Sequence, residues 1–223
     1  DMIDYLTIPL YAKGDLDQNQ YVGYVTGDLT DYGWVLPWAD DGVQVVMGLE
    51  GRKDSMVFDL DLNYNQGNAA GQGGATADVS GRVGVKEWFV EGRIPLVQGK
   101  TGAEELSLDL RYRSSDYDTG FDADTWNIGG SWAPIDSFKL RMSVSQAVRA
   151  PNINELYQPQ TIGLWSGTDE CAGPNPTLSE SECARTGVPA GTYGSVAVSP
   201  ADQYNGLFGG NPNLDPETSN SFT

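Results

Sequence analysis

Residues 138–149 read FKLRMSVSQAVR and are followed by APN at 150–152. Apolar residues alternate with polar ones in this stretch, which is the period-2 pattern of a β-strand with one apolar and one polar face. The apolar positions are Phe138, Leu140, Met142, Val144 and Val148. Pro151 has no N–H to donate to a neighbouring strand, so we expect the strand to end there. The stretch predicts a sheet whose two faces differ in polarity.

The roughly 65 residues from Asn152 to Pro216 show little periodicity, whereas connections in compact domains are usually about 4 to 6 residues long. A loop of this length is expected to be either functional or disordered. Order resumes at 209–217 (GGNPNLDPE), a turn-rich corner. We expect another strand to begin at Thr218.

The same alternation recurs toward the N-terminus and is clearest at Leu106, Leu108 and Leu110. With 138–149 it predicts six strands and the start of a seventh. The other five are expected at 20–36, 43–57, 82–97, 106–113 and 126–132. Short turns are expected at 37–42, 98–103 and 133–137, and longer connections at about 58–81, 116–124 and 151–216. The fold class is therefore an all-β antiparallel meander.

The long connections all fall at one end of this meander and the short ones at the other. Outer-membrane barrels have this asymmetry, with short periplasmic turns and longer extracellular loops, but a soluble sandwich shows the same alternation. Charges on the polar face favour a water-filled lumen, because an unpaired charge in a packed core is costly. Aromatic residues near strand ends match interfacial girdles or are ordinary sheet formers. They are Trp34, Trp38, Tyr112, Trp126 and Trp132.

Composition narrows the function classes. Lys and Arg total 13 and Asp and Glu total 31, which gives a net charge of −18 and opposes binding to nucleic acid. The sequence has no histidine, so a Ser-His-Asp triad or a His-ligated zinc cannot form within it. We expect no enzymatic activity, no cofactor and no bound metal. An acidic cluster around Gly120 is either a solvated loop or a calcium site, and the first is favoured. Its members are Asp116, Asp118, Asp122 and Asp124.

Several segments together resemble a known family. VRAPN at 148–152 with Glu155-Leu156, followed by GNPNLDPET at 210–218, resembles the barrel of TonB-dependent outer-membrane receptors. The likeness continues in VKEWFVE at 85–91, IPL at 94–96, PLYAKG at 9–14 and DQNQYV at 17–22. The family motif residues are Arg149, Pro151, Asn152, Glu155, Gly210, Asn211, Pro212, Leu214, Pro216 and Glu217.

The resemblance implies that residues 1–223 are part of a barrel of about 22 strands around a plug domain that lies outside this sequence. It implies a Gram-negative outer-membrane location, contact with the lipid bilayer, and uptake of a scarce nutrient powered by TonB acting through the plug. An oligosaccharide and a ferric siderophore are both open as cargo. Residues 1–4 (DMID) do not resemble a signal peptide, so we expect the sequence to belong to a longer chain.

The long loop carries most of the candidate binding residues. Aromatic rings with amide partners can grip sugars and other neutral polar ligands, or they can pack the loop against itself. The candidates are Tyr157, Trp165, Tyr193, Tyr204 and Phe208. Cys171 and Cys183 lie 12 residues apart in the same loop and are expected to form a disulfide, the alternative being two free thiols.

Charged residues on the polar face are expected to face the barrel lumen. Their arginines would contact an anionic ligand or pair with Asp109 and neighbouring carboxylates, and pairing is the default. The residues are Asp109, Arg111, Arg113, Arg141 and Arg149. The alternative to a transporter is a secreted all-β binding or adhesion module, in which the Leu106 to Leu110 face would lie in a protein core.

Overall fold

The structure is a computed structural model that describes residues 2, 5, 7–68 and 74–223. The chain divides into two compact units. The sheet unit comprises residues 14–58, 79–158 and 210–223, and the loop unit comprises residues 1–13, 59–78 and 159–209. No helix among the described residues is both long and apolar enough to span a bilayer.

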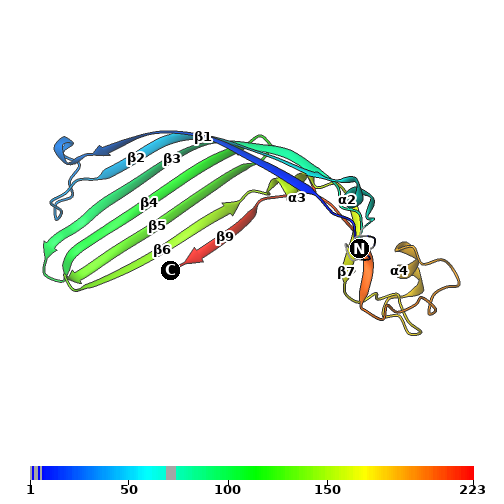
Figure 1. Cartoon of the computed structure of the whole chain (residues 1–223). Helices are drawn as coiled ribbons and strands as arrows, with labels where there is room; N and C mark the ends of the chain where they lie inside the picture. Colours follow the sequence, from blue (N-terminus) through cyan, green and yellow to red (C-terminus); the bar gives the residue numbers. More distant parts are fainter. Residues whose placement is uncertain (1, 3–4, 6, 69–73) are drawn as a thin grey trace. The chain divides into compact units, whose positions relative to one another are not determined.

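Within the described residues, seven strands form one sheet in the order β1-β2-β3-β4-β5-β6-β9 (Figure 1). Their bounds are β1 Ala12–Asp28, β2 Gln44–Leu60, β3 Val79–Lys100, β4 Ala103–Tyr117, β5 Asp122–Ile135, β6 Phe138–Arg149 and β9 Glu217–Phe222. Each strand from β2 onward pairs antiparallel with the next in this order. The predicted all-β meander is therefore confirmed.

Three predicted boundaries were wrong, two of them for a common reason. β1 begins at Ala12 and ends at Asp28, whereas alternation predicted a strand over 20–36. The acidic stretch at 116–124 is mostly strand, because Asp116 pairs with Asp122 across β4 and β5 and only 118–121 connect them. The missed residues 12–19, 114–117 and 122–125 are mostly polar on both faces, so hydrophobic alternation cannot reveal that the backbone ladder continues through them. The predicted continuation of the first strand to residue 36 was wrong for another reason, because the apolar residues of 29–36 belong to a connection that contains a short helix at Thr30–Tyr32.

The connections differ between the two ends of the meander. One end has the tight turns 101–102 and 136–137 and the connection 29–43, which includes the short helix η1 (Thr30–Tyr32). The short turn predicted at 37–42 was therefore wrong, because the connection there is 15 residues long. The other end has 61–78, 118–121 and 150–216. Residues 69–73, within the loop expected at about 58–81, lie outside the described residues. The connection 61–78 carries helix α2 (Leu62–Gln66).

The longest connection is not structureless, as its lack of periodicity had suggested. It carries α3 (Ile153–Tyr157), β7 (Thr161–Ser166), α4 (Glu180–Arg185) and β8 (Gln203–Phe208). β7 and β8 pair antiparallel as a two-stranded sheet in the loop unit. Each of these elements is at most six residues long, which is too short for a clear periodic pattern.

The strand register separates polar from apolar side chains, because directly opposed residues share a face. On one face, called the polar face, Glu91, Arg111 and Asn127 form one row across β3, β4 and β5. On the other, called the apolar face, Leu110, Ile128 and Val144 form a row that continues to Phe222 on β9. The seven-stranded sheet thus presents two chemically distinct surfaces.

The apolar face is open and is bordered by aromatic residues. Ile128 is 50% exposed, and the rings of Trp88 and Tyr112 lie 5.2 Å apart at one border. Nearer the tight turns, Trp132 donates its indole N–H to the carbonyl oxygen of Gly102 at 2.9 Å. From Trp126 to Ile135, β5 advances roughly 30 Å at about 3.4 Å per residue, which a tilt of about 40° projects to roughly 23 Å. This height is close to the apolar band of an outer-membrane barrel, about 25 Å.

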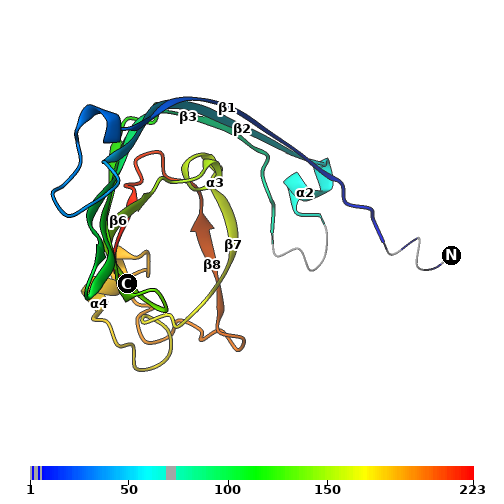
Figure 2. The ribbon, with the colours of Figure 1, turned by 90° about the vertical axis from the view of Figure 1, so that its left-hand side faces the viewer.

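Helix α3 identifies the concave side of the sheet (Figure 2). Its Ile153 and Leu156 are buried against Val83 of β3. The ring of Tyr157 lies against Gly81, where a Cβ atom would come within 2.4 Å of Tyr157 Cδ2. Val83 and Gly81 alternate in step with Glu91 along β3, so they belong to the polar face. The polar face is therefore the concave one.

If the apolar face contacts lipid, Ile128→Asp is expected to block assembly of the barrel in the membrane. A charged side chain on the lipid face of a barrel destabilises it, by roughly 2 to 4 kcal/mol for Arg or Lys at the midplane and by less for aspartate, whereas at a half-exposed position in water it costs little. The measurement is the fraction of the chain that reaches the folded, heat-modifiable form in isolated outer membranes. Asn127→Asp, on the adjacent residue and the opposite face, is the matched control and is expected to assemble normally. Equal assembly of the two variants would contradict a lipid-facing surface.

Candidate functional site

The two ends of the long connection meet at one arginine. Arg149, the last residue of β6, donates from Nη1 and Nη2 to the Glu155 carboxylate at 3.1 and 3.0 Å. It also donates from Nε and Nη2 to the Glu217 carboxylate at 2.9 and 2.8 Å. Both pairs are bidentate, which is the strong geometry for an arginine and a carboxylate. We call Arg149, Glu155 and Glu217 the clasp.

Local backbone chemistry supports the clasp. Asn152 and Glu155 form a capping box at the start of α3, with the Glu155 N–H donating to Asn152 Oδ1 at 2.9 Å and the Asn152 N–H donating to Glu155 Oε2 at 2.8 Å. Pro151, which precedes the N-cap, is buried. The Arg149 guanidinium and the Asn152 N–H together hold the pKa of the Glu155 carboxyl below its usual range. Glu155 therefore stays ionised in mildly acidic medium.

The returning chain is tied to the same place. The N–H groups of Gly210 and Asn211 donate to the carbonyl oxygens of Gln158 and Glu155, at 2.7 and 2.8 Å. Gly210 leaves no room for a side chain, since a Cβ would lie 2.7 Å from the Gln158 backbone nitrogen. A turn closed by the Leu214 N–H on the Asn211 carbonyl oxygen follows at 211–214 and includes Pro212, and Pro216 immediately precedes β9. The family motif residues thus build the base of the long connection.

Three of the five predicted aromatic residues come together. Trp165 pairs with Tyr204 across β7 and β8, with ring centroids 6.0 Å apart, and Phe208 lies on the same face of this hairpin. Tyr193 instead donates its hydroxyl to the Leu178 carbonyl oxygen at 2.8 Å, and Tyr157 packs on Gly81 in the sheet unit. We call the surface formed by Trp165, Tyr204 and Phe208 the aromatic face.

Glycines leave room for the Phe208 ring beside the hairpin backbone. Gly163 and Gly206 oppose each other between the aromatic residues. A Cβ on Gly163 would lie 3.2 Å from the Phe208 ring, and one on Gly206 would lie 3.1 Å from Trp165 Cβ. Trp165 and Phe208 remain 45% and 41% exposed. The aromatic face is therefore open to solvent and backed by glycine.

The opposite face of the hairpin is aliphatic and was missed by sequence reasoning. Ile162 pairs with Leu207, and Leu164 lies two residues further along the same face. All three side chains are exposed. The alternation in TIGLWS at 161–166 was the available signal, but it spans too few residues to separate a strand from a loop.

The charged residues of the polar face are paired unevenly. Arg113 donates to the carboxylates of Glu50 and Glu87 at 3.0 Å each and lies 5.1 Å from the centre of the Phe89 ring. The Glu50 and Glu87 side chains are buried, at 7% and 6% exposure, whereas the Arg113 side chain is 36% exposed. The two carboxylates of this ion-pair network are therefore largely removed from water. Sequence reasoning missed Glu50 and Glu87, which become neighbours only through the β2–β3 register.

The remaining arginines follow the expected pairing in part. Arg111 pairs with Glu91 at 3.5 Å, and Arg149 forms the clasp. Neither Arg141 nor Asp109 forms an ion pair or a side-chain hydrogen bond with any residue that the structure describes. Pairing is thus the rule for these arginines, with partners other than Asp109, and Arg141 is the exception.

The family model described as "TonB dependent receptor-like, beta-barrel" matches residues 4–223. The chain belongs to the TonB-dependent receptor family. A comparison with curated proteins and a comparison with solved structures gave no match. The family assignment therefore rests on the barrel sequence and not on a relative of known cargo.

Membership of this family confirms the predicted resemblance and gives the chain, which we call the receptor barrel from here on, its general role in transport. TonB-dependent receptors are transporters of the Gram-negative outer membrane and not enzymes. Transport by this family favours the receptor interpretation over a secreted binding module. Which nutrient the receptor barrel takes up is a separate question that the family leaves open.

The receptor barrel has a disulfide in its long connection, as predicted. Cys171 and Cys183 are bonded, with their Cα atoms 5.7 Å apart, and both are buried. Cys183 lies in α4, which Ser179 and Glu182 begin with a second capping box. The disulfide thus ties this helix to the chain before it.

The acidic residues at the β4–β5 turn do not converge. Among residues 7–68 and 74–223, no three His, Cys, Asp or Glu side chains lie close enough together to hold a metal ion. Asp118 instead accepts the Gly84 N–H at 2.8 Å, while Asp116 and Asp122 oppose each other in the strands. The calcium interpretation has no geometric support here.

Arg149→Gln is expected to raise the pKa of Glu155 toward its ordinary value, because the guanidinium is the main cause of its lowering. A carboxyl with a lowered pKa in the folded state adds stability above its unfolded pKa of about 4.3 and loses it as pH falls through the folded value. A ¹³C NMR titration of the side-chain carboxyls measures the change. Glu182, whose pKa is lowered by the Ser179 hydroxyl, is the internal control and is expected not to move. An unchanged Glu155 titration would contradict the clasp.

Replacing both Cys171 and Cys183 by serine is expected to destabilise the surrounding lobe by about 2 to 4 kcal/mol, because the open chain regains entropy when unfolded. Limited proteolysis is expected to cut faster within 167–202, with the seven-stranded sheet intact. The native receptor treated with a thiol-alkylating reagent without reductant provides the control and is expected to remain unlabelled. Labelling of both cysteines would show that they are free thiols.

Proposed function

We propose that the receptor barrel binds a scarce nutrient at its long connection, about 151–216, and imports it with energy delivered by TonB. The observation that carries this proposal is the aromatic face of the β7–β8 hairpin. Exposed aromatic rings on one face of the hairpin suit stacking against a sugar ring, and the polar residues of the hairpin can supply hydrogen bonds. An oligosaccharide is therefore the preferred cargo, and a ferric siderophore is the alternative.

The orientation of the receptor barrel follows from its connections. In outer-membrane barrels the long loops are extracellular and the short turns periplasmic. The two longest connections, 61–78 and 150–216, lie at the same end as 118–121, and we assign this end to the outside. The end that carries the tight turns 101–102 and 136–137, together with the connection 29–43, is assigned to the periplasm. The aromatic face then belongs to an extracellular connection, where a nutrient arrives.

The same assignment places the two faces of the sheet. The exposed apolar face meets lipid, and the concave polar face lines the lumen. Asp109, Arg111, Arg113, Arg141 and Arg149 would then face the lumen. Arg113 stiffens this wall, because removing it would leave the two buried carboxylates of Glu50 and Glu87 without a counter-charge.

TonB enters the proposal through the family. It acts through a plug domain, and residues 4–223 are accounted for by the barrel. The partners we propose are thus TonB by way of the plug, the lipid bilayer and a small nutrient. The clasp would hold both ends of the binding connection while the plug moves, since Arg149 and Glu217 belong to adjacent barrel strands.

Trp165→Ala is expected to weaken nutrient binding about tenfold, since losing one stacked ring costs roughly 1 to 1.5 kcal/mol. Binding is measured by titrating the purified intact receptor in detergent with a panel of linear oligosaccharides and of ferric siderophores. Ile162→Ala, on the opposite face of the same hairpin, is the matched control and is expected to bind normally.

The panel separates the two cargo classes. Trp165-dependent binding of an oligosaccharide supports the preferred cargo, and Trp165-dependent binding of a ferric siderophore alone supports the alternative. Binding that is equally strong in the native protein and in Trp165→Ala would show that the aromatic face is not the nutrient site.

A further inference from the structure

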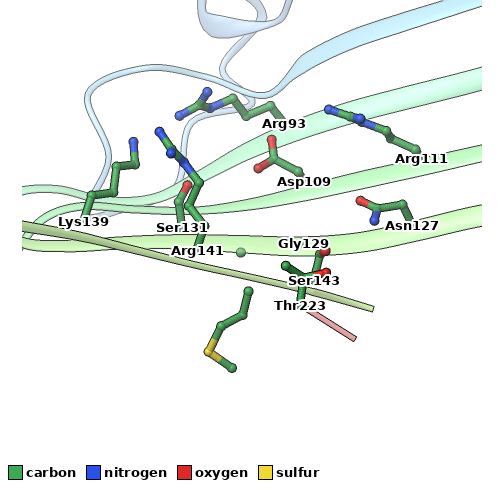
Figure 3. A pocket seen from close by; sticks show the side chains of 12 residues that line it. Arg93, Asp109, Arg111, Asn127, Gly129, Ser131, Lys139, Arg141, Ser143 and Thr223 are labelled. Atoms are coloured by element: carbon green, nitrogen blue, oxygen red, sulfur yellow. The ribbon is translucent and has the colours of Figure 1, made fainter. Parts of the chain in front are cut away.

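A hollow on the polar face arises from the small residues of β5. Gly129 and Ser131 contribute almost no side-chain volume there, while β3 and β4 on one side and β6 on the other carry long side chains. The result is a pocket of about 250 Å³ with a low floor and basic walls (Figure 3). We call it the basic trough, and its walls carry Arg93, Arg111, Lys139 and Arg141.

The basic trough is positively charged, whereas the whole chain is strongly acidic. Four of the 13 basic residues gather here in a protein of net charge −18. Three carboxylates among the described residues offset part of this positive charge. Asp109 lies on the wall, Glu91 pairs with Arg111 at 3.5 Å, and Glu105 is shared by Arg93 at 2.5 Å and Lys139 at 2.6 Å. The local balance is one positive charge in excess.

Arg141 is the basic residue of the trough that has no partner among the described residues. Its guanidinium has no ion pair or hydrogen-bond partner among the described residues, although the other three basic side chains of the trough each have one. A guanidinium offers five N–H donors in a planar fork that matches the two oxygens of a carboxylate. The amide of Asn127 lines the same pocket, whereas the Ser131 hydroxyl is already engaged with Ser107 at 3.0 Å.

We propose that the basic trough binds a carboxylate, with Arg141 as the principal partner and Asn127 as a second donor. An excess of one charge matches a single carboxylate better than a dianionic phosphate, which Asp109 would oppose. Gly129 lets the ligand approach the sheet, because only a backbone floor lies beneath it. This site is separate from the aromatic face and does not depend on which nutrient that face binds.

Two sources can supply the carboxylate. It can belong to a free ligand that enters the concave side of the sheet, or to an Asp or Glu side chain of a protein segment that lies there in the intact receptor. The recognising chemistry is the same in both, and accessibility of Arg141 to reagents distinguishes them.

The experiment uses the intact receptor in detergent and benzoate, a monocarboxylate, as the probe. Benzoate binding is measured by calorimetry for the native protein, Arg141→Gln and Gly129→Leu. A side chain at Gly129 fits, since a Cβ there meets no atom closer than 3.6 Å, so Gly129→Leu fills the trough without displacing the backbone. Arg82→Gln is the matched control, because Arg82 is exposed, unpaired among the described residues and outside the trough. Phenylglyoxal labelling of Arg141 and Arg82 is followed by peptide mapping.

The outcomes are separable. Benzoate binding that falls at least tenfold in Arg141→Gln and Gly129→Leu, but not in Arg82→Gln, supports the site with a free ligand. No benzoate binding, with Arg141 protected from phenylglyoxal while Arg82 reacts, supports the site with an internal carboxylate. Benzoate binding that survives in Arg141→Gln, or no binding with Arg141 as reactive as Arg82, overturns the proposal. None of these results bears on nutrient binding at the aromatic face.

Discussion

The register of the antiparallel ladder is the constraint on which this structure depends. Side chains alternate between the two faces, so a slip of one residue between neighbouring strands would move every polar side chain of a strand to the apolar face. The row of Leu110, Ile128 and Val144 and the row of Glu91, Arg111 and Asn127 exist only in the observed register. The buried Arg113 network helps to fix it, since its Glu50 and Glu87 partners are directly opposed across β2 and β3.

Sequence reasoning succeeded where one face is continuously apolar and failed where it is not. The alternation at Leu106, Leu108 and Leu110 was sufficient to find β4, and similar patterns found β2, β3, β5 and β6. Residues 12–19 of β1 are held by backbone pairing with few apolar side chains, so the sequence carries no periodic signal for them. The Glu50–Arg113–Glu87 network was also invisible, because its members are distant in sequence and meet only through the sheet.

At the candidate site, too, sequence reasoning identified some features and missed others. Resemblance pointed to Arg149, Glu155 and Glu217 as a motif, but only the structure shows why these three belong together, with one guanidinium serving two carboxylates. Of the five aromatic candidates, three share a surface and Tyr157 and Tyr193 pack against their own surroundings. Composition of a loop identifies residues able to bind, whereas short-range pairing decides which of them face the same way.

The base of the long connection separates the pairing of the barrel strands from the structure of residues 159–209. Contacts from Arg149 to Gln158 on one side and from Gly210 to Glu217 on the other close the chain before residues 159–209 begin. Those residues belong to a different compact unit from the strands that flank them. Mutations, insertions or wholesale exchange within 159–209 can therefore accumulate without disturbing strand pairing. If residues 159–209 hold the nutrient site that we propose, a lineage can change the nutrient it binds while it inherits the same scaffold.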